Sequence, residues 1–276
     1  MPLPPHTHAI TFPAQPFPAQ VEHPGALVHI PPGYDPTKPL DLVVYSRGMG
    51  SCVSAVAASE PTACRPGGKL RHGARLVELF DAARVNALLI FPEFKVEQAT
   101  TDPGQLKNVG GTMAFLNGVL ASAPVVAALG SVRTVVPHVR SVFLAAHSAG
   151  WDATGEMITA KDVPVRGVAL FDSMYGNAAI FKKFALRVGR GEISNGRFSS
   201  IYIGGAPESN SVAVAAELQR LLPSAFVRVG EPRADLTAGD FTAPPVFFKR
   251  FRTEHNLVPE KVFGLVLAGG GFDPIP

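Results

Sequence analysis

The sequence has little charge and no long apolar run, and these two shortages exclude several classes of protein. Charged residues make up 17% of the 276 residues, and 25 basic side chains are nearly balanced by 22 acidic ones. No block of Lys and Arg stands out, so nucleic acid is not an expected partner. The longest apolar runs stop well short of a membrane span. Hydrophobic residues still reach 46%, which indicates a folded protein with a sizeable core.

The sequence also has few cysteines, namely Cys52 and Cys64, which lie twelve residues apart. No CxxC motif or nearby pair of histidines supports a zinc site. A disulfide between the two cysteines is expected if the protein is exported, because disulfides form in oxidising compartments. Two reduced thiols in a cytosolic protein fit the sequence nearly as well, so the cysteines leave the compartment open.

The N-terminal residues 1–24 lack the basic and apolar regions of a signal peptide and are rich in proline. As written, the sequence predicts a cytoplasmic protein, and a trimmed signal peptide would make it extracellular or periplasmic. The prolines predict an extended arm over the domain surface. Residues 25–276 are predicted to form a single domain. The sequence does not indicate the oligomeric state.

Apolar, β-branched runs alternate with helix-like segments along the rest of the chain. Strands are predicted at 25–32, 41–48, 85–94, 139–148, 165–173, 198–206 and 245–255. Helices are predicted at 69–83, 111–129, 150–160, 177–188, 210–222 and 258–269. This alternation is typical of an α/β fold with a doubly wound, mostly parallel sheet and helices on both faces. Two long loops, 94–111 and 230–245, are expected to flank a pocket, and the first of them could close as a lid.

The stretch AHSAG, residues 146–150, lies between a buried apolar run and a helix-like pattern. This is the context of the nucleophile elbow G-x-S-x-G, a turn so tight that small residues are needed two positions before and after the serine. Those positions hold Ala146 and Gly150, and the alanine departs from the motif by one methyl group. The alternative is that Ser148 is the N-cap of the following helix. The context favours Ser148 as a nucleophile.

A serine nucleophile needs a base, and His255 is the best placed of the eight histidines. It follows the last strand and precedes the last helix, so it can reach the same edge of the sheet as Ser148. The alternative is an ordinary polar residue beside a helix. His147 is expected to point away from the pocket of the nucleophile and to serve in packing.

The histidine in turn needs a carboxylate that orients it. Asp172 directly follows the apolar run after the elbow, and Glu208 follows the next strand, which is the commoner place in this chain order. Asp240 lies in the loop before the last strand, and Asp152 is too close in sequence to Ser148. The better-fixed Asp172 is the predicted acid, and Glu208 stays open as the alternative.

Charge that develops on the carbonyl oxygen of a substrate needs two backbone N–H donors. Ala149, immediately after the serine, is the first predicted donor. Gly48 or Met49, in the segment SRGMGSC, is the second, since glycines permit a close approach of the backbone. The alternative is a simple glycine-rich turn between a strand and a helix.

The segments AHSAG and SRGMG, together with the late His255, resemble the α/β-hydrolase superfamily and its esterase- and lipase-like members. The resemblance covers most of the chain, from residue 41 to residue 269. It implies a serine hydrolase that forms an acyl-enzyme without a metal or organic cofactor. By this resemblance Ser148 attacks, His255 transfers the proton and Asp172 orients His255.

Three further residues are predicted to bind substrate, namely Arg47, Trp151 and Tyr175. Many relatives carry His-Gly where Arg47-Gly48 stands. As a substrate-binding residue, Arg47 would hold a carboxylate or phosphate, and a structural salt bridge is the alternative and the safer expectation. The expected substrate is a small-molecule or polymeric carboxylic ester. The same residues fit an amidase, lactonase or peptidase, and the departures at Arg47 and Ala146 leave room for a lyase or a non-catalytic binding protein.

Overall fold

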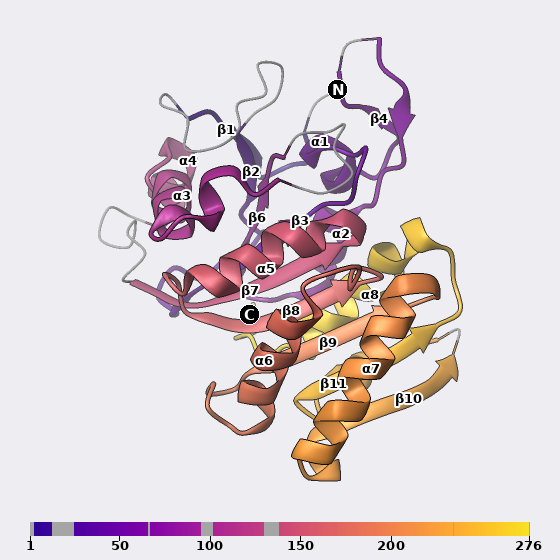
Figure 1. The fold of residues 1–276 in the computed structure, drawn as a ribbon. Helices are drawn as coiled ribbons and strands as arrows, with labels where there is room; N and C mark the ends of the chain where they lie inside the picture. The colour runs from indigo at the N-terminus through magenta and orange to yellow at the C-terminus, as the bar shows by residue number, and fades with distance from the viewer. Residues whose placement is uncertain are drawn as a thin grey trace.

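A nine-stranded sheet runs through the molecule (Figure 1). The structure, a computed structural model, describes residues 3–12, 25–65, 67–94, 102–129, 138–233 and 235–275. The strand order is β1-β2-β6-β3-β7-β8-β9-β11-β10. The strands are β1 (Thr7–Ile10), β2 (Ala26–His29), β3 (Leu40–Ser46), β6 (Ala87–Pro92), β7 (Val139–His147), β8 (Val165–Phe171), β9 (Arg197–Tyr202), β10 (Val227–Arg233) and β11 (Val246–Phe251). From β6 to β10 all neighbours are parallel, and β1 and β2 add an antiparallel edge.

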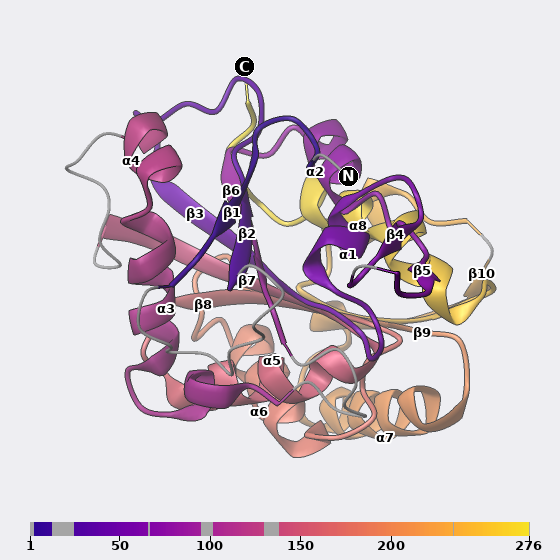
Figure 2. The ribbon, with the colours of Figure 1, turned by 90° about the horizontal axis from the view of Figure 1, so that it is seen from above.

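Helices cover both faces of this sheet, as the sequence predicts. One face packs against α3 (Gly111–Leu120), α4 (Ala123–Leu129), α5 (Trp151–Ala160), α6 (Ala178–Gly189) and α7 (Gly205–Leu221). The other packs against α1 (Val53–Ala57), α2 (Leu76–Ala83) and α8 (Val258–Ala268). In Figure 2, α5, α6 and α7 lie on one side of the strands and α2 and α8 on the other. Alternate residues of each central strand therefore enter two different cores, which explains the continuous apolar runs.

Two predicted helices differ from the structure. The segment predicted as a helix at 69–83 begins with a short strand, β5 (Leu70–Arg71), which pairs with β4 (Thr62–Ala63). Its helix, α2, begins only at Leu76, after Arg75 takes a left-handed φ of 55°. The segment 111–129 forms α3 and α4 with a bend of 73° between them. A continuous helix would bring the ring of Pro124 against the carbonyl four residues earlier, so the helix breaks before it.

Besides the short strands β4 and β5, two strands of the nine-stranded sheet were not predicted. β1 falls within the proline-rich arm and pairs antiparallel with β2, and β10 overlaps the start of the loop predicted at 230–245. Most of the arm, at 13–24, and the part of the possible lid at 95–101 lie outside the described residues. No single described helix has the length and apolarity of a membrane span, which α3 and α4 reach only as a bent pair.

Candidate active site

Ser148 occupies a sharp turn between β7 and α5. Its φ of 50° lies in the left-handed region, which is strained for a residue other than glycine. A Cβ built on Gly150 would lie 2.2 Å from the carbonyl oxygen of Ser46 at the end of β3, so only glycine fits there. Ala146, two residues before the serine, is fully buried between β3 and β8, where its methyl group is accommodated. The turn therefore has the tightness of a nucleophile elbow.

Asp172 and His255 meet at the same edge of the sheet. Asp172 directly follows β8 and is buried, and His255 begins a 3-10 turn (His255–Leu257) between β11 and α8. The Oδ2 atom of Asp172 lies 2.6 Å from Nδ1 of His255, and its Oδ1 atom accepts the backbone N–H of Ile203 at 3.1 Å. A proton on Nδ1, shared with Asp172, leaves Nε2 of His255 as the nitrogen that can accept another proton.

Ser148 and His255 line one cavity of about 360 Å³. Gly48 and Met49 also line the cavity. They belong to the segment 48–52, which is predicted to donate to the oxyanion and is called the oxyanion segment below. A Cβ built on Gly48 would lie 3.0 Å from Cβ of Ser148, so this segment packs directly on the turn at Ser148. Within the described part of the chain, no hydrogen bond joins the side chains of Ser148 and His255. Such catalytic hydrogen bonds are often long in a free enzyme and tighten when the substrate binds.

Two of the three other carboxylates considered, Glu208 and Asp240, have different partners. Glu208 lies in the first turn of α7 and forms an ion pair with Arg250 at 3.3 Å. Asp240 binds Arg228 at 2.7 Å and closes a capping box with Thr237. Asp172, in contrast to Glu208 and Asp240, contacts the imidazole of His255.

The orientation predicted for His147 is wrong. His147 lines the cavity, its ring centroid lies 4.6 Å from that of His255, and its Nε2 atom lies 3.1 Å from the carbonyl oxygen of His255. Strand alternation places residue 147 on the face of Phe143 and Ala145, where α8 packs. Burial, reinforced by the charge of His255, lowers the pKa of His147 to about 3. A neutral His147 therefore donates its Nε2–H to His255 and holds the backbone of that residue.

The prediction that Arg47 binds substrate is also wrong, and the structural alternative holds. The Arg47 side chain is 1% exposed, and its Nε atom donates to Oε1 of Glu93 at 2.7 Å. The two terminal nitrogens donate to the carbonyls of Gly48, at 3.1 Å, and Phe94. Because the side chain is buried and each of its nitrogens already donates to a protein acceptor, Arg47 is not accessible to a ligand in the cavity.

Glu93 is a residue of the site that sequence reasoning missed. Its Oε1 atom accepts a hydrogen bond from Nε of Arg47, the residue that precedes the segment 48–52 in the chain. Its Oε2 atom accepts the backbone N–H of Val53, the residue that follows this segment, at 3.0 Å. One carboxylate thus fixes both ends of the segment 48–52. The only signal in the sequence is a lone glutamate after one apolar strand and a lone arginine after another. These residues are 46 positions apart, and nothing local pairs them.

Neither Trp151 nor Tyr175, the aromatic residues predicted to bind substrate, is among the described residues that line the cavity. The ring of Tyr175, 43% exposed, stands edge-on to His255 with centroids 6.4 Å apart. Burial, and then the charge of Asp172, raises the pKa of Tyr175. Trp151 is partly buried against the core, and a Cβ on Gly176 would meet its ring at 2.6 Å. Tyr175 can therefore touch a ligand of His255, whereas Trp151 packs beneath the loop that carries Tyr175.

A disulfide joins Cys52 and Cys64. Cys52, the last residue of the predicted oxyanion segment 48–52, is the N-cap of α1, and Cys64 follows β4. Because β4 pairs with β5, and Leu70 and Arg71 of β5 line the cavity, the disulfide ties one wall of the cavity to the oxyanion segment.

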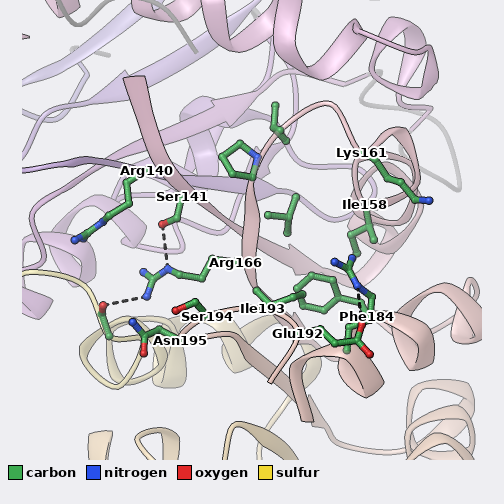
Figure 3. A pocket seen from close by; sticks show the side chains of 15 residues that line it. Arg140, Ser141, Ile158, Lys161, Arg166, Phe184, Glu192, Ile193, Ser194 and Asn195 are labelled. Atoms are coloured by element: carbon green, nitrogen blue, oxygen red, sulfur yellow. Dashed lines mark hydrogen bonds and ion pairs between the residues drawn. The ribbon is translucent and has the colours of Figure 1, made fainter. Parts of the chain in front are cut away.

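A second cavity, of about 520 Å³, lies where β7 and β8 begin, at the ends of these strands away from Ser148 and Asp172 (Figure 3). Each of its three arginines contacts at least one protein group: Arg140 binds Asp41, Arg166 donates from Nε to Ser141 at 3.0 Å, and Arg187 pairs with Glu192 at 3.4 Å. No group of three or more His, Cys, Asp or Glu side chains in the described residues could hold a metal ion. The cavity lined by Ser148 and His255 is the candidate active site because a strained serine and a histidine paired with a carboxylate meet there.

No protein-family model and no curated protein matches the sequence. Among solved structures, one similar chain is a serine-to-alanine variant of the feruloyl esterase module from Clostridium thermocellum in complex with sinapinate. It has a TM-score of 0.52 and 15% identity, over 88% of this chain and 82% of that one. A protein named FAE has a TM-score of 0.50 and 14% identity, with the same coverage. At such identities the likeness concerns the fold alone.

Proposed function

We propose that this chain, which has the α/β-hydrolase fold predicted from its sequence, is a serine hydrolase that cleaves a carboxylic ester. One observation carries the proposal: the Asp172–His255 pair, at 2.6 Å, opens into the cavity that contains the strained Ser148. Ser148 and Asp172 directly follow β7 and β8, and His255 lies in the turn after β11, which supports assigning these three residues to one site.

In the proposed mechanism, Oγ of Ser148 attacks the ester carbonyl while Nε2 of His255 takes the hydroxyl proton. The backbone N–H groups of Ala149 and of Gly48 or Met49 stabilise the oxyanion. His255 then protonates the leaving alcohol, and an acyl-enzyme remains on Ser148. A water that gives its proton to His255 hydrolyses this intermediate, releases the acid and restores the serine. Asp172 keeps Nδ1 protonated and stabilises the imidazolium throughout.

Two other observations support an ester substrate and an oxidising compartment. The fold neighbour from Clostridium thermocellum is a feruloyl esterase module, so aromatic acyl esters belong in the first substrate series. The Cys52–Cys64 disulfide favours export, because such bonds persist outside the reducing cytosol.

The test is labelling of the folded protein with a fluorophosphonate probe, followed by peptide mapping. We expect the label on Ser148, its loss in Ser148→Ala, and strongly slowed labelling in His255→Ala. His138→Ala, which removes an exposed histidine, is the matched control and keeps the wild-type rate. Hydrolysis of 4-nitrophenyl butyrate falls by at least about 10⁴-fold in Ser148→Ala. A label on another serine, or no label on folded protein, would refute the proposal.

A further inference from the structure

Arg71 sets the charge of the candidate active-site cavity. Of the described residues that line the cavity, it is the only Lys, Arg, Asp or Glu. Two histidines of the lining add no net charge of their own. His72 binds the carboxylate of Glu260 at 2.9 Å, and burial lowers the pKa of His147, so that its ring stays neutral. A substrate that enters the cavity therefore meets one fixed positive charge.

The guanidinium of Arg71 lies beside the oxyanion segment. A Cβ built on Gly50 would lie 3.5 Å from Nη1 and 3.6 Å from Nη2 of Arg71, so both terminal nitrogens face this segment. The backbone of Arg71 is fixed because β5 pairs with β4 and Cys64 anchors β4 to Cys52. Within the described part of the chain, the guanidinium makes no hydrogen bond and no ion pair.

Arg71 therefore contrasts with Arg47, whose nitrogens are all occupied by protein acceptors. Arg71 is half-buried and lines the same cavity as Ser148, and the described residues supply no acceptor for its guanidinium. A planar guanidinium matches a carboxylate with two parallel hydrogen bonds. A single guanidinium also balances the single charge of a carboxylate, whereas a phosphate dianion would need further cations.

We propose that the ester substrate carries a carboxylate beside the scissile bond and that Arg71 binds it. The proposal rests on the proposed function, since it names the class of ester that Ser148 cleaves. In this proposal the residue that selects anionic esters lies on β5, whereas the proposed catalytic residues follow β7, β8 and β11.

The test compares esters that differ only in charge. One pair varies the acyl part, with mono-4-nitrophenyl glutarate against 4-nitrophenyl valerate, corrected for spontaneous hydrolysis. The other varies the alcohol part, with 4-carboxyphenyl butyrate against 4-acetylphenyl butyrate. We expect the wild type to prefer the anionic ester of at least one pair by about tenfold or more in kcat/KM, which is the scale of a charge-assisted hydrogen bond.

Three variants locate that preference. Arg71→Met reduces the anionic-to-neutral ratio of kcat/KM to about one, mainly through a higher KM for the anionic ester. Arg71→Lys keeps the positive charge but loses the paired N–H donors of the guanidinium, so we expect an intermediate anionic-to-neutral ratio of kcat/KM. Lys69→Met removes an exposed cation two residues away that does not line the cavity, and it keeps the wild-type ratio.

Equal turnover of the two esters in both wild-type pairs, or a preference that survives in Arg71→Met, overturns the role of Arg71. If hydrolysis of the neutral ester still depends on Ser148 in that case, the proposed function stands. If folded wild-type protein hydrolyses no ester of either pair, both the proposed function and the role of Arg71 are refuted.

Discussion

Replacing Glu93 by glutamine is expected to destabilise the protein by about 3 kcal/mol. Three donors converge on this carboxylate: Nε of Arg47 at 2.7 Å, and the backbone N–H groups of Val53 and Phe94 at 3.0 Å each. Both members of the ion pair are at most 2% exposed. Breaking a buried ion pair costs about 3–5 kcal/mol, because one charge stays buried without compensation. Because glutamine keeps one acceptor oxygen, we expect the loss of stability in Glu93→Gln to lie at the lower end of this range.

The assay is urea unfolding with the disulfide intact, alongside turnover of 4-nitrophenyl butyrate by the folded variant. Turnover is expected to fall by about tenfold, because the segment 48–52 loses the brace that positions an oxyanion donor. Glu78→Gln is the matched control. Glu78 forms an ion pair with Arg75 in which both side chains are about half exposed, and its loss costs at most about 0.5 kcal/mol.

A free energy of unfolding for Glu93→Gln within about 0.5 kcal/mol of wild type would refute this reasoning. A second check is the variant Arg47→Met combined with Glu93→Gln. Because the double change removes the uncompensated charge, its cost should be smaller than the sum of the two single costs by at least about 1 kcal/mol. Additive costs would show that the two side chains do not act as a pair.

Three further predictions concern the same edge of the sheet. Burial lowers the pKa of His147 from 6.5 to about 3, so below pH 6.5 the unfolded chain binds a proton that the folded chain does not. The free energy of unfolding should therefore fall between pH 7 and pH 5 by about 2 kcal/mol more in wild type than in His147→Gln, as measured by urea unfolding at both pH values. Equal losses would contradict this. Since Ser148 has a left-handed φ, Ser148→Gly should be about 1 kcal/mol more stable than Ser148→Ala in thermal unfolding, the reverse of the order inside a helix. Replacing Cys52 and Cys64 by alanine should cost about 3 kcal/mol, since the bond closes a loop with a sequence separation of 12, and a cost below 1 kcal/mol would contradict the loop-entropy account.

The arrangement of the sheet could be predicted because it depends on signals that repeat along the chain. Strands buried on both faces, such as β7, read as continuous apolar runs, and their alternation with helices indicates a parallel sheet. The place of His255 follows from its position after the last long strand. Strands β1 and β10 were missed because they lie at the two edges of the sheet, where proline and polar residues weaken the pattern.

The local surroundings of the site could not be read from the sequence in the same way. The partner of Arg47 is Glu93, from another strand, and only the folded sheet brings the strand ends together. Likewise, the position of His147 depends on α8 and on the 3-10 turn that begins at His255, more than 100 residues later. Sequence patterns report burial and periodicity, whereas these contacts depend on which elements become neighbours.

The small sheet of β4 and β5 lies apart from the nine-stranded sheet, yet it supplies Leu70 and Arg71 to the cavity. It is anchored through Cys64, and it contributes no residue to the proposed triad. A library of variants confined to residues 67–72 would therefore sample new cavity walls while the strand ends that carry the reacting groups stay constant. This small sheet is therefore a part of the cavity wall in which substitutions leave every residue of the proposed triad unchanged.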